Sequence, residues 1–206
     1  MEQITNFYLF LISVVSISLS GVMAPGPVFA VTIAKGSEDK TAGFLISLGH
    51  GIIEFPLMFL IYFGFAAFLS SNIAQKTIGF AGGLILIYMG VRLLKTHRQD
   101  SVQPSRFRHS SIVSGILATG ANPYFLLWWA TIGAALVVNA SAFGFVGFSI
   151  FAVTHWMCDL LWNTFVSLAV FKSRRFWTNK VQSAVFTFCF AVLTAFGAFF
   201  IVSALL

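Results

Sequence analysis

The chain has 206 residues, of which 58% are hydrophobic and only 9% carry a charge, and its formal net charge is +6. A soluble domain has about 25% charged residues, so this composition excludes an ordinary soluble domain. It indicates an integral membrane protein, and the lipid bilayer is its expected partner. The length suffices for one membrane domain with about six helices of about 20 residues. The positive charge does not indicate a nucleic-acid partner, because the basic residues lie at the ends of apolar segments and in short connections.

Six apolar segments follow one another along the chain and are expected to cross the membrane as helices. Their approximate bounds are Phe7–Ala34, Ala42–Leu69, Thr77–Leu94, Ser111–Val138, Ala142–Phe171 and Val181–Leu206. A polar stretch from Lys95 to His109 separates the first three segments from the last three. The sequence thus predicts an all-α polytopic membrane protein, with a three-span repeat in residues 1–95, a connecting loop in residues 96–110 and a second three-span repeat in residues 111–206.

The basic residues fall almost entirely on one side of the membrane when the side alternates with each expected crossing. Eleven of the 12 Lys and Arg residues then follow the first, third and fifth segments, and only Lys76 lies on the other side. Cytoplasmic connections of membrane proteins carry an excess of Lys and Arg. We therefore expect a multi-pass plasma-membrane protein with the loop at residues 95–110 in the cytoplasm and both termini outside.

Two of the segments contain helix-breaking residues: Pro25, Gly26 and Pro27 interrupt the first, and Asn122 and Pro123 interrupt the fourth. Each Pro removes a backbone donor and clashes with the preceding turn. One interpretation is a packed kink. The other is a binding site, because a half-helix that begins after a break directs free N–H groups at a substrate carboxylate, while the carbonyls before the break suit an ammonium group. We expect these five residues to bind substrate.

The second and fifth segments each carry a histidine followed four residues later by an acid, namely His50 with Glu54 and His155 with Asp159. Residues at this spacing share one face of a helix. A charged side chain at the bilayer centre costs about 2.5–3.5 kcal/mol. Three roles are open: proton, ion or substrate handling in a transporter, which we favour, a transition-metal site formed by these four side chains, or a buried network that only holds helices together.

The two halves of the chain also resemble each other in the order of these motifs. Pro27 and Pro123 are 96 residues apart, and the two His–acid pairs are 105 residues apart. Because each half has three expected spans, the second half would enter the membrane from the opposite side. This is the pattern of an inverted-topology repeat, and chance similarity between apolar segments is the alternative.

The same motifs resemble the lysine exporter family of LysE/RhtB-type translocators. The resemblance rests on Pro25-Gly26-Pro27, on Ala121-Asn122-Pro123 and on the apolar run from Leu84 to Leu94, and it covers nearly the whole chain. It implies secondary active export of amino acids or related solutes, driven by a proton or ion gradient. Members commonly carry an Asp in the second span, where this chain has Glu54. The wider superfamily includes cation and heavy-metal exporters.

The expected function is therefore the export of amino acids or related small zwitterionic solutes. Efflux of divalent or heavy-metal cations through His50, Glu54, His155 and Asp159 is one alternative, and a non-transporting membrane scaffold is another. The sequence has no motif of a soluble enzyme, so no catalytic residue and no cofactor are expected. Substrate identity, coupling ion and oligomeric state are not predicted.

Overall fold

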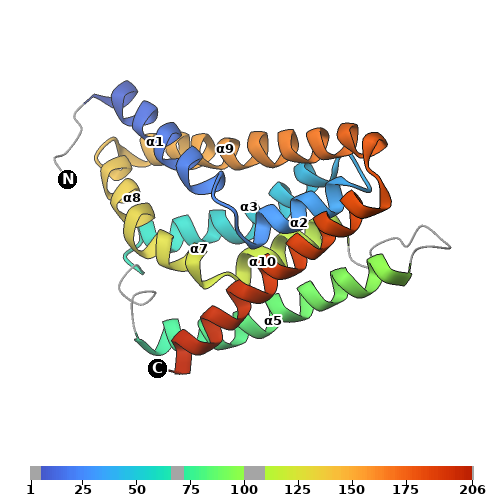
Figure 1. Cartoon of the computed structure of the whole chain (residues 1–206). Coiled ribbons are helices and arrows are strands. Elements are labelled where there is room, and N and C mark those ends of the chain that lie inside the picture. The colour runs from blue at the N-terminus through green and yellow to red at the C-terminus, as the bar shows by residue number, and fades with distance from the viewer. Residues whose placement is uncertain (1–5, 66–71, 100–109, 206) are drawn as a thin grey trace.

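The computed structural model describes residues 6–65, 72–99 and 110–205, and the regular elements in these ranges are all helices (Figure 1). The first half contains α1 (Phe7–Val22), α2 (Pro27–Gly36), α3 (Ala42–Tyr62) and α5 (Asn72–Gln99). The second half contains α6 (Ser111–Gly120), α7 (Pro123–Trp128), the π-helix η1 (Trp129–Gly133), α8 (Ala134–Ser141), α9 (Gly144–Ser173), the short 3-10 helix η2 (Arg174–Phe176) and α10 (Asn179–Leu205). The predicted all-α class is confirmed for the described part of the chain.

Several of these helices are long and apolar enough to cross a membrane. In the described ranges there are four such stretches, which are α3, Pro123–Ser141, Gly144–Phe176 and α10, and the bent pair of α1 and α2 makes a fifth if it counts as one span. The apolar parts of α5 and α6 are shorter, at Lys76–Val91 and Ser111–Gly120. The chain is therefore a multi-pass membrane protein, and the number of six spans stays a prediction.

The outer surface of the helices matches a lipid environment. Large apolar side chains such as Leu9, Phe80, Val146, Phe165 and Phe199 are exposed on it. A helix that crosses the hydrocarbon core of a bilayer needs such apolar side chains on its outer face. Among the described residues, phenylalanines thus serve the surface, as at Phe165, as well as the core, as at Phe148.

The bounds of α3 and α5 differ most from the expected segments, and α5 begins at Asn72, ahead of the expected Thr77. The second segment was expected to reach Leu69, but α3 ends at Tyr62, and Gly64 follows with a φ of 97°, a left-handed conformation that ends helices. α5 continues to Gln99, so the polar connection begins later than residue 95 or 96. Residues 95–99 contain neither Gly nor Pro, which allows the helix to continue. Residues 66–71 and 100–109 lie outside the described ranges.

Glycines let α3 approach its neighbours closely. A Cβ at Gly43 would collide with the backbone of Asn163 in α9, and a Cβ at Gly49 would collide with the backbone of Ile112 in α6. Likewise, a Cβ at Gly115 in α6 would collide with the backbone of Ile46 in α3. Small residues at helix contacts allow this backbone approach in membrane proteins. The second His–acid helix, α9, is thereby held directly against the first, α3.

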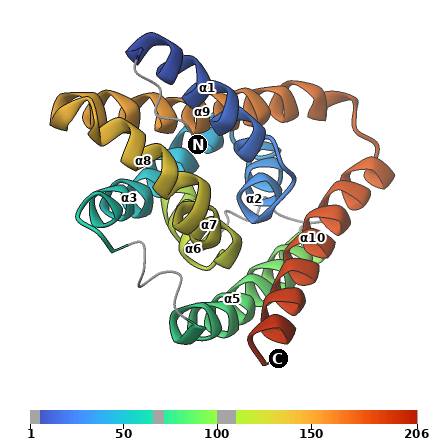
Figure 2. The same cartoon turned by 90° about the vertical axis from the view of Figure 1, so that its left-hand side faces the viewer.

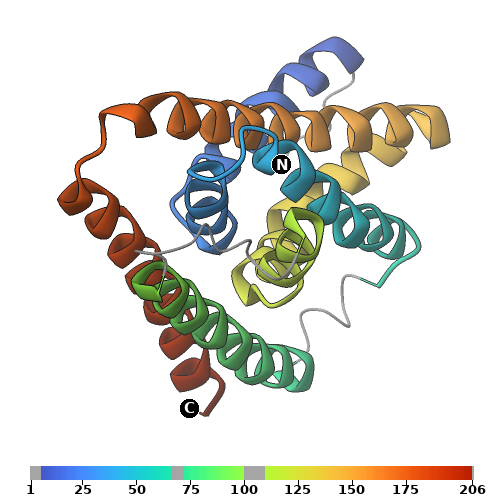
Figure 3. The ribbon, with the colours of Figure 1, turned by 90° about the vertical axis from the view of Figure 1, so that its right-hand side faces the viewer.

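α5 and α10 form a closely packed pair on one side of the molecule. A Cβ at Gly83 would lie 2.6 Å from the carbonyl oxygen of Gly197, and a Cβ at Gly197 would lie 2.7 Å from that of Gly83. Figure 2 shows this pair on the side opposite α1 and α9, with α3, α6 and α7 between them. Figure 3 shows from the other side that α2 (blue) and α6 (yellow-green) lie between α9 (orange) and the pair.

Candidate functional site

The first predicted break is confirmed, since α1 and α2 meet at an angle of 73°. Pro27 occupies the first position of α2, where its fixed φ fits a helix and its missing N–H is not needed. Gly26 precedes it with φ −151° and ψ −171°, an extended conformation that any residue adopts. The prolines therefore account for the break, and glycine's extra freedom is not required. No side chain caps the N-terminus of α2.

The second predicted break is also confirmed, but its N-terminus is capped. α6 ends at Gly120, and α7 begins at Pro123. Asn122 precedes α7, and its Oδ1 accepts a hydrogen bond of 3.1 Å from the N–H of Tyr124. Asn122 therefore caps its own helix, and its side-chain NH2 group is left to interact elsewhere. Of the two half-helices that begin at a break, only α2 has an N-terminus without a side-chain cap.

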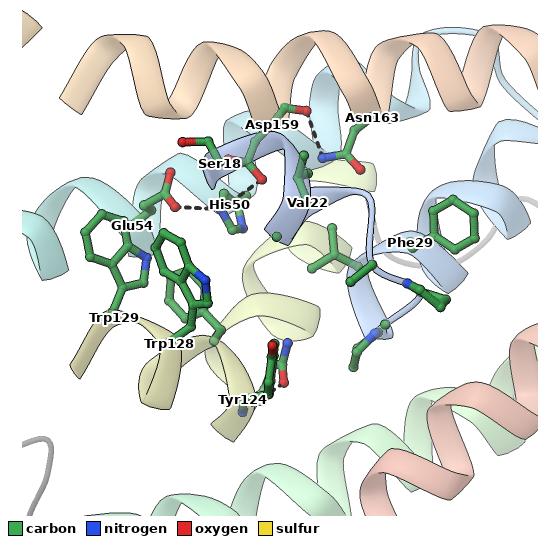
Figure 4. A pocket seen from close by; sticks show the side chains of 18 of the residues that line it. Ser18, Val22, Phe29, His50, Glu54, Tyr124, Trp128, Trp129, Asp159 and Asn163 are labelled. Atoms are coloured by element: carbon green, nitrogen blue, oxygen red, sulfur yellow. Dashed lines mark hydrogen bonds and ion pairs between the residues drawn. The ribbon is translucent and has the colours of Figure 1, made fainter. Parts of the chain in front are cut away.

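The two His–acid pairs meet in one buried cluster, which we call the His–carboxylate cluster and define as His50, Glu54, His155 and Asp159. Figure 4 labels His50, Glu54 and Asp159 of this cluster. Oε1 of Glu54 lies 3.0 Å from Nε2 of His50 and 3.2 Å from Nε2 of His155. The carboxylate of Asp159 lies 3.7 Å from His50 Nε2 and 3.9 Å from His155 Nε2. Each side chain of the cluster is at least nine-tenths buried, apart from that of Asp159, which is 11% exposed.

Each histidine of the cluster is also held from its other ring nitrogen. Nδ1 of His50 lies 2.8 Å from the hydroxyl of Thr119 in α6, and Nδ1 of His155 lies 2.6 Å from the hydroxyl of Ser18 in α1. α1 and α6 are the half-helices that precede the two breaks. A hydrogen bond to one imidazole nitrogen fixes the orientation of the ring and the role of the other nitrogen. The half-helix before each break is thus linked to one histidine of the cluster by a hydrogen bond.

A second polar network joins α2, α3 and α9 beside the cluster. The side-chain NH2 of Asn163 donates to the carbonyl oxygen of Asp159 at 2.9 Å and to the hydroxyl of Ser47 at 3.2 Å. The hydroxyl of Thr32 in α2 donates to Oδ1 of Asn163 at 3.3 Å. These residues are buried, and the network connects the half-helix after the first break to the helix that carries Asp159.

Aromatic side chains of α7 and η1 cover the cluster. The ring of Trp128 stacks on His155 at a centroid distance of 5.4 Å, and Trp129 meets the same ring edge-on at 5.0 Å. Phe125 contacts the ring of His50 edge-on at 5.2 Å. Figure 4 shows Trp128 and Trp129 side by side next to Glu54. These rings exclude water from one side of the cluster.

A cavity of about 310 Å³ connects the first break, the cluster and the start of α7. Eight of the nine predicted site residues line this cavity, and they are Pro25, Gly26, Pro27, His50, Glu54, Asn122, His155 and Asp159. Pro123 is buried but does not belong to the lining. The volume lies near the lower end of the range of about 300–1,000 Å³ for small-molecule sites.

One oxygen of the cluster has no partner in the described part of the chain. Oε2 of Glu54 is buried and accepts no hydrogen bond, whereas Oε1 of the same carboxylate accepts two. His50, Glu54 and Asp159 also offer donor atoms that lie within 4.8 Å of one another. Imidazole and carboxylate suit transition metals as well as hydrogen-bond donors. Chemically, the cluster can accept a proton, an ammonium group or a metal cation.

Some residues of the site were not predicted from the sequence. Ser18, Thr119, Asn163 and Trp128 all contact the cluster or its helices. A polar residue within an apolar segment is only a weak signal of a functional site. The hydroxyls of Ser18 and Thr119 contact histidines that are 137 and 69 residues away in the chain. Only the packing of the helices reveals these pairs.

Comparison with known proteins identifies the family of the chain. Residues 19–204 match the LysE type translocator family. The chain belongs to this family. A relative from Bacillus subtilis (strain 168), named "Putative amino acid efflux protein YcgF", is 28% identical over 193 residues, which cover 91% of each of the two chains. No solved structure gives a significant match to this LysE type translocator.

Proposed function

We propose that this LysE type translocator exports amino acids or related small zwitterionic solutes by secondary active transport, coupled to a proton or ion gradient. One observation carries the proposal: a single cavity has an uncapped helix N-terminus on one side and buried carboxylates on another. These are complementary to the two charges of an amino acid. The family match and the name of the Bacillus subtilis relative, which refers to amino acid efflux, support the same function.

The substrate carboxylate binds at the first break in this proposal. Pro25, Gly26 and Pro27 line the cavity, and the first N–H groups of α2 point out of a helix N-terminus that no side chain caps. Such groups and the helix dipole favour an anion. Asn122 also lines the cavity and offers its side-chain NH2 group. Pro123 contributes indirectly, because it starts α7 and so positions Asn122.

The substrate ammonium group binds at the His–carboxylate cluster, where Oε2 of Glu54 has no other partner. A proton or cation that enters the cluster competes with the ammonium group for Glu54 and Asp159. This competition couples substrate release to ion uptake, because the same carboxylates cannot hold both at once. His50 and His155 orient the carboxylates and take part in the exchange of protons.

We further propose six spans arranged as two inverted three-span repeats, in residues 1–95 and 111–206, with both termini outside and the connection at residues 96–110 in the cytoplasm. The contact between the ends of α9 and α2 supports this arrangement, since the guanidinium of Arg174 donates to the carbonyl oxygens of Ser37 at 2.7 Å and Glu38 at 3.1 Å. Figure 1 shows the turn between α9 and α10 and the turn between α2 and α3 at the same end of the helices.

This topology is tested by thiol labelling in intact cells. Cys158 and Cys189 are first replaced by Ala, and single cysteines are then placed at the exposed positions Lys76 and Lys180. A membrane-impermeant maleimide should label the cysteine at 76 from outside and leave the cysteine at 180 unlabelled. Labelling of both positions from outside contradicts the proposed orientation.

The proposed substrate class is tested in proteoliposomes that contain an equimolar mixture of amino acids. Matched analogues that lack either the carboxylate or the amino group are included, and efflux is followed by mass spectrometry. At least one amino acid should leave faster than from protein-free liposomes, while its amine and acid analogues should not. If no amino acid leaves faster, or if an analogue leaves as fast as its amino acid, the zwitterion proposal is wrong.

A further inference from the structure

We infer that the cavity selects neutral amino acids with a bulky apolar or aromatic side chain, and that it excludes lysine-like and acidic substrates. This inference rests on the proposed function, because it assumes that a zwitterion binds between the first break and the His–carboxylate cluster. The proposed function places the carboxylate and the ammonium group of the substrate, and the inference concerns its side chain. It also assigns a role in substrate selection to Trp128.

The charges around the cavity match one ammonium group and one carboxylate. The lining in the described residues contains no Lys and no Arg, and its acids are Glu54 and Asp159. Both acids already lie within 4 Å of imidazoles, and Oε2 of Glu54 is the oxygen of the pair that has neither a partner nor exposure to solvent. Oε2 of Glu54 therefore suits one ammonium group, and the carboxylate of Asp159 beside it faces both imidazoles at 3.7 and 3.9 Å.

A second charge on the substrate would find no partner in this lining. The side-chain ammonium of lysine would compete with its own α-ammonium group for the same oxygen. The side-chain carboxylate of glutamate would meet no cationic side chain other than the imidazoles, which already face Glu54. Burial of an unpaired charge is unfavourable. The cavity thus discriminates against both kinds of charged side chain.

The remainder of the lining is apolar and includes several aromatic rings, apart from the polar side chains of Ser18, Asn122, Tyr124 and Asn163. Its members come from four of the broken or neighbouring elements, and they include Val22, Val28, Phe29, Phe125, Trp128 and Phe196. A cavity of about 310 Å³ exceeds the needs of the charged part of an amino acid alone. Apolar surface that is removed from water in such a cavity favours binding. A bulky uncharged side chain uses this space best.

Trp128 has the position of a residue that determines specificity. Its ring stacks on His155, and its other edge faces α1, where a Cβ added to Gly21 would lie 3.6 Å from the indole nitrogen. Trp128 and Trp129 both line the cavity, but Trp129 is fully buried against the core, whereas Trp128 is only half-buried. Trp128 therefore offers a ring to a substrate side chain that enters between the cluster and α1. Aromatic rings prefer apolar and aromatic partners in this geometry.

The selectivity of the unmodified protein gives the first test. Proteoliposomes are loaded with one labelled amino acid at a time, and efflux rates are compared at equal concentration for leucine, phenylalanine, alanine, lysine and glutamate. Leucine or phenylalanine should be preferred over lysine and glutamate by at least about tenfold. Equal or faster efflux of lysine or glutamate overturns the inference but leaves amino acid export standing. Absence of efflux for all five overturns the inference, and absence for every amino acid in the mixture overturns export itself.

The role of Trp128 gives the second test. Trp128→Leu should lower the ratio of phenylalanine to alanine efflux by about tenfold. A ratio within one variant does not depend on how much of that variant folds. The matched control is Trp162→Leu, because Trp162 is a half-buried tryptophan of α9 that does not line the cavity, and its ratio should stay unchanged. An unchanged ratio in Trp128→Leu contradicts the assigned role.

Discussion

At the scale of single residues, the carboxylate of Glu54 is the most unusual feature of the molecule. Oε1 accepts hydrogen bonds from two imidazoles, while Oε2 is buried and has no partner among the described residues. An unsatisfied buried acceptor costs about 1–3 kcal/mol. A donor that reaches Oε2 offsets this cost, which is the physical basis of the ammonium site that we propose.

Ser18 is predicted to act through His155. Ser18→Ala removes the hydroxyl that lies 2.6 Å from Nδ1 of His155, and a hydrogen bond of this kind contributes about 1 kcal/mol. Because the ring would then be less well oriented towards Glu54, the rate of transport should fall about fivefold. Initial rates of amino acid efflux from proteoliposomes measure this effect.

The control for Ser18→Ala is Ser20→Ala. Ser20 lies on the same helix, but it is exposed, and its hydroxyl donates only to the carbonyl oxygen of Ile17 at 2.7 Å. Ser20→Ala should keep the wild-type rate. If Ser18→Ala lowers the melting temperature but leaves the rate and its pH profile unchanged, Ser18 has only a structural role.

The residues of the site were predictable to different degrees. His50, Glu54, His155 and Asp159 stand out in the sequence because ionisable side chains are costly within apolar segments. Their convergence could not be deduced, because it depends on how closely α3 and α9 pack. The contact between Ser18 and His155 was not predictable for the same reason, since the two residues are 137 positions apart.

At the scale of helices, the close contact between α3 and α6 decides whether the cluster assembles. Gly115→Ala would place a methyl group against the backbone of α3 at Ile46. Because neither backbone can move away without disturbing the packing, we expect a loss of about 1–3 kcal/mol and a lower melting temperature. Thermal unfolding in detergent, followed by intrinsic fluorescence, measures this change.

Gly120→Ala in the same helix is the matched control. A Cβ at Gly120 would lie 3.9 Å from Cδ1 of Ile53, which is an ordinary van der Waals distance. This variant should therefore unfold at the wild-type temperature. Equal unfolding temperatures for both variants would show that α3 and α6 do not pack closely at Gly115.

The helix breaks were predictable, whereas the finer geometry of the helices was not. Pro27 and Pro123 mark the starts of α2 and α7, because Pro is compatible with the first turn of a helix and not with its interior. Pro56 shows the limit of this rule, since it lies inside α3, which remains continuous. Asn122 before Pro123 is a favoured N-cap residue, whereas Gly26 before Pro27 has no side chain that could cap, so the residue types distinguish the capped N-terminus of α7 from the uncapped one of α2. Nothing in the sequence indicates the π-helix η1.

At the scale of the whole molecule, composition alone indicated a membrane protein of helices, because 9% charged residues cannot cover a soluble surface. The resemblance to lysine exporters is confirmed by the family match over residues 19–204. The extension of α5 to Gln99 is not evident from the sequence, because polar residues are typical of a loop but do not by themselves end a helix. The inverted repeat and the six spans remain predictions.

In the proposed mechanism, an ion gradient drives export through the His–carboxylate cluster. Proteoliposomes loaded with amino acids should release them faster when a proton or sodium gradient is imposed. Glu54→Gln combined with Asp159→Asn should abolish this acceleration, because neither amide can take up a proton or hold a cation as a carboxylate does. The control is Glu38→Gln, which changes an exposed carboxylate just after α2 and should keep gradient-driven efflux.

The most direct test is therefore the rate of gradient-driven amino acid efflux in wild-type protein and in the variant with Glu54→Gln and Asp159→Asn, measured in the same preparation of liposomes. The account predicts rapid efflux with the wild-type protein and efflux at the protein-free rate with the double variant. Equal gradient-driven rates in the two proteins would contradict it.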